Sequence, residues 1–131
     1  MSEAADEVWN RACDSFASLT HPGDAALAAV LLCHGMAVNG GLLHACEGME
    51  PDQRAGAVAG YRLLGPDAAA DAVEDVARQA AALDPDELAA AEELEAEADR
   101  RYRAALPEDD ETIAQAFRDH LRRHPEAYAL L

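Results

Sequence analysis

The sequence contains no lysine, and β-branched residues are scarce, with six valines, two threonines and one isoleucine. No segment alternates apolar and polar residues with a period of two, which excludes a β-sheet as the main architecture. Apolar residues, half of the chain, instead recur at helical spacing between prolines and glycines. We therefore predict an all-α fold in which residues 1–131 form a single acidic helical domain, a bundle of about six or seven helices.

Positive charge is also scarce. The chain has 26 acidic residues and only 10 arginines, so its formal net charge is −16. Such a chain repels phosphate backbones and anionic lipids, so we expect no direct nucleic acid binding and no membrane binding. The start of the chain lacks the basic and apolar segments of a signal peptide, and its longest apolar stretch, residues 25–33, is about half a membrane span. We expect a cytoplasmic protein whose three cysteines are reduced thiols.

Proline and glycine predict where the first helices begin and end. The first helix is expected over residues 4–19, with Phe16 and Leu19 on its buried face. His21-Pro22-Gly23 should end it. Asp24 is then expected to cap a second helix, which is apolar almost all round and is therefore predicted to be the central buried helix.

The rest of the chain shows four further helical stretches. Two are expected over residues 51–65 and from residue 66, because proline is favoured in a first turn. The segment Asp84-Pro85-Asp86-Glu87 predicts a capping box that opens a helix to about residue 105, with Leu88 on its buried side. The last helix is expected to begin after residues 107–111 and to end at residues 124–125.

Asn39-Gly40-Gly41 interrupts this helical pattern. Asparagine and glycine tolerate the left-handed backbone conformation that ends many helices. We interpret the three residues as a structural turn, in which Gly40 or Gly41 takes a positive φ. Asn39 is expected to cap a short helix that follows over residues 42–46.

Histidine and cysteine flank this turn and raise the question of a metal site. The pairs Cys33-His34 and His44-x-Cys46 are adjacent or two residues apart, and neither spacing aims both side chains at one ion easily. We interpret the thiols as core filling. A metal- or ligand-binding enzyme centred on His34, His44 and Cys46 remains as an alternative.

A second pair, His120 and His124, lies four residues apart on one predicted helix face. The pair lacks the glutamate of the H-E-x-x-H pattern, and Arg122 and Arg123 stand between its members. We interpret these side chains as cations near a helix C-terminus. Because no nucleophile elbow, phosphate-binding loop or dinucleotide motif is present either, we predict no metal, no cofactor and no catalytic residue, and hence no enzyme.

The acidic residues are concentrated, with 16 of them and only four arginines between residues 67 and 111. Over residues 84–99, eight carboxylates at a helical rise of about 1.5 Å per residue give one charge per roughly 3 Å. One DNA strand carries a phosphate about every 3.4 Å. We therefore predict a surface for a basic protein partner, with DNA-binding proteins as the kind of partner that this charge spacing fits. The predicted partner-binding residues are Asp84, Asp86, Glu87, Glu92, Glu93, Glu95, Glu97, Asp99, Glu108, Asp109, Asp110 and Glu111.

The segment Ala37-Val38-Asn39-Gly40-Gly41-Leu42-Leu43 resembles the V-x-N-G-G motif of the DNA-mimic protein family, which comprises small acidic bacterial proteins. Residues 60–65 resemble that family's A-x-x-x-[IL]-G-A helix end, and His124-Pro125-Glu126-Ala127-Tyr128 resembles its terminal motif. Residues 44–47 depart from the family, which often has an aromatic-rich stretch there. The resemblance, over about residues 24–128, implies an all-helical fold, a homodimer and occupation of a transcription factor's DNA-binding face.

Two other functions are compatible with the sequence. One is an immunity or antitoxin-type protein that neutralises a specific effector, for which a small and partly apolar contact patch is expected. The other is a helical domain whose charge has no binding role and serves solubility, as acidic, alanine-rich helices commonly do. Partner capture at different salt concentrations separates these possibilities from the charge-based one.

Overall fold

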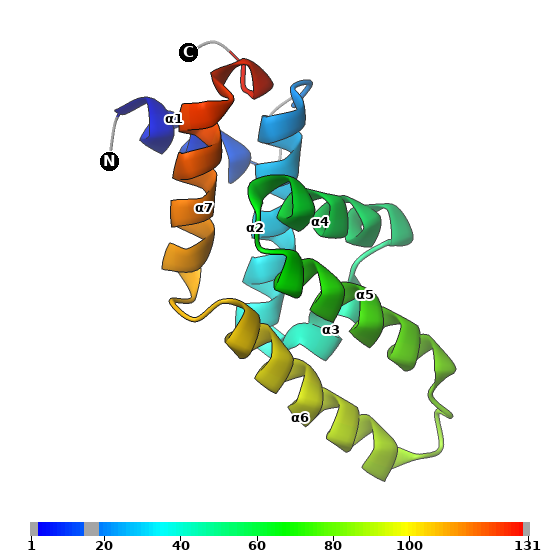
Figure 1. The fold of residues 1–131 in the computed structure, drawn as a ribbon. Helices are drawn as coiled ribbons and strands as arrows, with labels where there is room; N and C mark the ends of the chain where they lie inside the picture. Colours follow the sequence, from blue (N-terminus) through cyan, green and yellow to red (C-terminus); the bar gives the residue numbers. More distant parts are fainter. Residues whose placement is uncertain (1–2, 15–18, 130–131) are drawn as a thin grey trace.

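The computed structural model describes residues 3–14 and 19–129, and within these ranges it contains helices and no strands, which confirms the all-α prediction (Figure 1). Seven α-helices and one 3-10 helix follow one another along the described part of the chain. They are α1 (Glu3–Ala12), α2 (Pro22–Gly40), α3 (Leu42–Gly48), α4 (Pro51–Leu64), α5 (Asp67–Ala82), α6 (Leu88–Ala105), α7 (Asp110–Arg123) and η1 (Pro125–Ala127).

Helix α2 lies at the centre of the fold and packs against α1, α3, α4 and η1. Its Leu27, Val30 and Cys33 side chains are fully buried, as the apolar pattern predicts. Gly60 of α4 allows the close approach of α2, because a Cβ at this position would lie 2.6 Å from the carbonyl oxygen of Ala26. Among the described residues, α2 is the one helix long and apolar enough to cross a membrane, a criterion that core helices also meet.

Helix α1 is shorter than expected, because it ends at Ala12 rather than near residue 19. The sequence that follows is rich in cysteine, aspartate, serine and threonine, whose helix propensities are low. Leu19 is half-buried and lies outside the helix. Phe16 lies outside the described residues.

Asp24 does not cap α2 as predicted. The helix begins at Pro22 after His21, so Asp24 falls within its first turn, where it is only 1% exposed. Its Oδ1 accepts a hydrogen bond from Arg11 Nη2 of α1 at 2.6 Å, and its Oδ2 accepts one from the backbone N–H of Ala129 at 2.7 Å. Asp24 therefore joins the first helix, the central helix and the end of the described chain.

The predicted capping box before α6 is also wrong. Asp84 Oδ1 accepts a hydrogen bond from the backbone N–H of Asp86 at 3.0 Å, so Asp84 stabilises the turn that reverses the chain between α5 and α6. The helix begins only at Leu88, which is 74% exposed rather than buried. The reciprocal pattern occurs instead at α4, where Gln53 Oε1 accepts from the backbone N–H of Glu50 at 2.8 Å.

Helices α5 and α6 pack against each other as an antiparallel pair, and Figure 1 shows this pair extending away from the other helices. Leu94, Ala98 and Tyr102 form the buried side of α6, as the helical spacing predicts. The opposite side of α6 and the turn before it face solvent. The residues with the highest density of negative charge therefore lie at a projecting part of the molecule.

Candidate functional site

The acidic residues predicted to bind a partner lie on α6 and on the turns at its two ends. Eleven of the twelve are exposed, and Asp99 is half-buried. An ionised carboxylate at the surface keeps its charge and attracts cations from a distance. A buried carboxylate, in contrast, is neutralised by a partner or by a proton. The structure thus leaves the negative charges at the surface, where another molecule can reach them.

Three of these twelve residues form ion pairs within the described chain, and a fourth accepts a hydrogen bond from the backbone of another helix. Glu97 pairs with Arg100, and Glu111 pairs with Arg118. Asp110 Oδ1 contacts His34 Nε2 at 2.5 Å. Asp99 Oδ1 accepts a hydrogen bond from the backbone N–H of Leu42 at 3.0 Å. These four carboxylates therefore contribute to the internal contacts of the fold.

The other eight form no ion pair with a described residue. Six of them lie together in the α5–α6 turn and the first half of α6, and we call these six the unpaired acidic surface. Its members are Asp84, Asp86, Glu87, Glu92, Glu93 and Glu95. Glu108 and Asp109, the remaining two, lie in the turn at the other end of α6.

Helical geometry divides the carboxylates of α6 into two rows rather than one. Residues three, four and seven apart share a face, so Glu92, Glu95 and Asp99 form one row. Glu93 and Glu97, four apart, form the other, which lies beside α5, where both line a shallow groove with Gln79. The buried residues of α6 separate the two rows on the inner side of the helix.

The Asn39-Gly40-Gly41 segment forms the predicted turn, but by a different mechanism. Asn39 and Gly40 continue α2, and only Gly41 leaves the helix, with a φ of 94° that favours glycine. Asn39 is exposed and does not cap α3. The carboxylate of Asp99 performs this role from α6, as its hydrogen bond to Leu42 shows.

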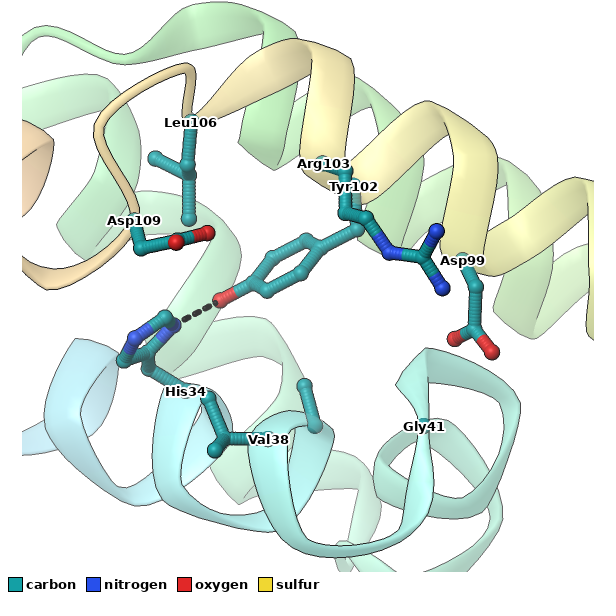
Figure 2. A pocket seen from close by; sticks show the side chains of 9 residues that line it. His34, Val38, Gly41, Asp99, Tyr102, Arg103, Leu106 and Asp109 are labelled. Carbon is teal, nitrogen blue, oxygen red and sulfur yellow. Dashed lines mark hydrogen bonds between the residues drawn. The ribbon is translucent and has the colours of Figure 1, made fainter.

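A chain of hydrogen bonds, buried except at its Asp110 end, lies beside this turn and connects four helices, and Figure 2 shows its bond between His34 and Tyr102. His34 of α2 contacts Asp110 of α7 through Nε2, and its Nδ1 lies 2.8 Å from the hydroxyl of Tyr102 of α6. The Tyr102 hydroxyl also bonds to the hydroxyl of Tyr61 of α4. Because a carboxylate only accepts, His34 Nε2 donates to Asp110, Tyr102 donates to His34 Nδ1, and Tyr61 donates to Tyr102.

Burial raises the pKa of both tyrosines well above the usual value for a phenol. Both hydroxyls therefore stay protonated at neutral pH, and neither oxygen can act as a base or as a nucleophile in the phenolate form. The chain of hydrogen bonds holds α2, α4, α6 and α7 together.

A cleft of about 360 Å³ opens next to Tyr102, between α2, α6 and the turn that follows α6. Figure 2 shows Val38 and Gly41 on its α2 side, with Asp99, Tyr102 and Arg103 on its α6 side. The hydroxyl of Tyr102 and the carboxylate of Asp99 are already engaged in the contacts above.

Comparison of the chain with family models, curated proteins and solved structures finds no match. The resemblance to the DNA-mimic family therefore rests on the sequence motifs alone. A function must be inferred from the site itself rather than from relatives.

The histidine and cysteine residues around the turn do not assemble into one site. His34 is committed to Tyr102 and Asp110, His44 is exposed, and the buried Sγ of Cys46 lies 3.6 Å from the carbonyl oxygen of Val73. Burial raises the pKa of the Cys46 thiol to about 11 and that of Cys33 to about 12, so both stay protonated. No group of three or more metal-ligating side chains occurs in the described ranges.

The role of Tyr61, Tyr102 and Asp110 in a single hydrogen-bonded chain was not predicted from the sequence. Tyr102 is recognisable only as one member of the apolar stripe of its helix. Its partners lie 41 and 68 residues away, so local spacing carries no signal for them. Asp110 was predicted to face a partner molecule, but it contacts His34.

Proposed function

We propose that the protein is an acidic protein-binding module whose unpaired acidic surface binds a basic surface of another protein. The partner that we propose is a DNA-binding protein, with the carboxylates occupying positions that phosphates would take. The single observation that carries this proposal is the set of six exposed carboxylates without ion pairs between residues 84 and 95.

The distribution of arginines supports this proposal. Arg78 and Arg101 both contact Asp75 of α5, and Arg100 contacts Glu97. The cations nearest to the unpaired acidic surface are thus held by other carboxylates and do not neutralise it. A projecting surface with uncompensated charge steers a positively charged partner and accelerates the encounter, and this effect weakens steeply with salt.

The spacing of the charges supports a DNA-binding protein as the partner. Carboxylates in one row of α6 are separated by three or four residues, or about 4.5–6 Å along the helix axis. Each row is therefore more widely spaced than the phosphates of one DNA strand, which follow one another about every 3.4 Å, whereas the two rows together place one carboxylate per roughly 3 Å of helix axis. A lysine- or arginine-rich surface that tracks a phosphate backbone could therefore contact several carboxylates at once.

The test is capture of proteins from a lysate of the encoding organism at low and at high salt, with duplex DNA as a competitor. We expect the triple variant Glu92→Gln, Glu93→Gln, Glu95→Gln to lose most of the low-salt capture. The matched control, Glu3→Gln, Glu7→Gln, Glu47→Gln, removes the same charge from exposed positions elsewhere and is expected to keep it. Added duplex DNA should release the partner from the wild-type protein.

Two outcomes would contradict the proposal. Equal capture by both triple variants would show that the position of the charges is irrelevant. Capture of the same protein at low and high salt would show that the contact is not electrostatic, as expected for an immunity or antitoxin-type protein that binds through a partly apolar patch. Measurement of the captured proteins by mass spectrometry distinguishes these outcomes from the expected one.

A further inference from the structure

A pair of histidines lies at the end of α7, far along the chain from the unpaired acidic surface. His120 belongs to the last turn of the helix and is 6% exposed, and His124 is the first residue beyond the helix and is exposed. The centroids of the two imidazole rings are 5.0 Å apart, and the ring planes are inclined by 42°. The proposed function does not use either side chain.

One nitrogen of each ring is already held by an oxygen. His120 Nδ1 lies 2.9 Å from the hydroxyl of Tyr128, and His124 Nδ1 lies 3.3 Å from Oε1 of Glu126. Histidines that bind metals typically hold their second nitrogen in this way, against a carboxylate or another oxygen. In a neutral His124 ring, the contact with the carboxylate of Glu126 places the proton on Nδ1 and leaves the lone pair on Nε2.

The Nε2 atom of His120 is also available. It has no hydrogen bond to a described residue. In the described ranges, the one side-chain nitrogen or oxygen that is fully buried and has no hydrogen bond is Arg11 Nε, so His120 Nε2 is not fully buried. His120 Nε2 therefore reaches solvent.

The distance between the rings fits a shared ion. Two imidazoles that bind one ion through Nε2 at about 2.1 Å have centroids roughly 4.5–5.2 Å apart for angles at the metal between about 90° and 109°. The observed 5.0 Å lies within this interval. The separation of the rings is thus compatible with a shared tetrahedral or octahedral ion.

The neighbouring arginines oppose such an ion less than the sequence suggests. Arg122 Nη2 contacts Asp119 Oδ1 at 3.1 Å, and Arg123 Nε donates to the carbonyl oxygen of Asp119 at 3.2 Å. Both guanidinium groups therefore have acceptors on Asp119, the residue immediately before His120. Their positive charge is partly balanced by the carboxylate of Asp119.

We propose that His120 and His124 bind one divalent transition-metal ion, of the class of Zn²⁺, Ni²⁺ and Cu²⁺, through their Nε2 atoms. Imidazole ligands favour these ions, and water completes the coordination because the chain supplies two ligands. Since Tyr128 and Glu126 hold the same rings, the ion fixes the end of α7 to the segment that follows it.

The test is calorimetric titration of the protein, without a polyhistidine tag, with Ni²⁺ or Zn²⁺ in excess Mg²⁺, which occupies weak carboxylate sites. We expect one ion per chain in the wild type. Its affinity should fall roughly tenfold or more in His124→Gln, because one imidazole remains. His44→Gln removes an exposed histidine outside the pair and is expected to bind as the wild type does.

A second measurement reports on the ligand atoms directly. The imidazole ¹⁵N resonances of His120 and His124 should shift on addition of diamagnetic Zn²⁺, with the larger change at Nε2, whereas those of His44 should not. Equal affinities of the wild type and His124→Gln, or shifts spread over all the histidines, would overturn the proposal. His124 is exposed, so its substitution leaves the core intact.

Discussion

The molecule contains two buried histidine–tyrosine pairs with nearly the same local geometry and different surroundings. His34 Nδ1 lies 2.8 Å from the Tyr102 hydroxyl and His120 Nδ1 lies 2.9 Å from the Tyr128 hydroxyl, and the two histidines are 7% and 6% exposed. The second nitrogen of His34 is held by Asp110, whereas that of His120 is left without a hydrogen bond among the described residues.

This difference shows that the neighbours of a buried histidine determine its role. In the first pair, His34 also contacts Asp110 and Tyr102 also bonds to Tyr61, so this pair connects four helices. In the second pair, burial and then the nearby charges lower the pKa of His120, and its Nε2 has no hydrogen bond to a described residue. One pair stabilises the interior, and the other can bind an additional ligand.

Among the variants that test the difference between the two histidine–tyrosine pairs, the tyrosine substitutions are expected to change the free energy of unfolding most. Tyr102→Phe removes a hydroxyl with two buried partners and should lower the free energy of unfolding by about 2–4 kcal/mol. Tyr128→Phe removes a hydroxyl with one partner and should cost about 1–2 kcal/mol. Urea unfolding of both variants measures the difference, and equal losses would show that the longer chain of hydrogen bonds adds no stability.

A smaller change in the free energy of unfolding is expected from substitution of Asp110, the carboxylate that contacts His34 and has no counterpart at His120. Asp110→Asn weakens the contact with His34 and should lower the free energy of unfolding by about 1 kcal/mol, since the Asp110 side chain is 80% exposed. Asp109→Asn removes the same charge from the neighbouring position, which has no ion pair, and should change stability by less than about 0.5 kcal/mol. Indistinguishable unfolding curves for the two variants would contradict this role of Asp110.

The smallest effect is expected in the pH dependence of stability. The pKa of His120 is lower in the folded protein than its usual value of about 6.5, so the unfolded chain binds the proton more readily. Its contribution to stability is present above pH 6.5 and is lost as the pH falls toward the pKa of the folded state. Unfolding free energies between pH 7.5 and 5 should fall more steeply in the wild type than in His120→Gln. Parallel curves would exclude this role for His120.

Much of the fold could be predicted from the sequence, because helical spacing and the positions of proline and glycine are local signals. The helix from Pro51, the central position of α2 and the positive φ of Gly41 follow from such signals. The capping of α3 could not be predicted, because its acceptor, Asp99, lies 57 residues from Leu42 in the chain. Asp24 was misassigned for the same reason, since its partners are distant in sequence.

In the candidate site, too, some features can be predicted from local sequence and others depend on contacts between residues distant in the chain. Exposure of the acidic residues follows from their position opposite the apolar stripe of α6, and the sequence suffices to predict it. Which carboxylates are neutralised depends on arginines and a histidine brought close by folding, such as Arg118 for Glu111 and His34 for Asp110. The sequence therefore predicts the set of twelve residues. The structure distinguishes the three that form ion pairs, and Asp99, which bonds to the backbone of α3, from the other eight.

The contact of Asp24 with both Arg11 and Ala129 has a consequence for how the chain could be rearranged. One buried carboxylate holds the first helix and the end of the described chain at the same place, and Figure 1 shows α1 and the segment that follows α7 at the same end of the molecule. A short flexible linker between the termini would preserve that anchor. The polypeptide could then be opened in the exposed turn between α5 and α6, so that a circularly permuted protein retains its core while its new ends emerge among the carboxylates.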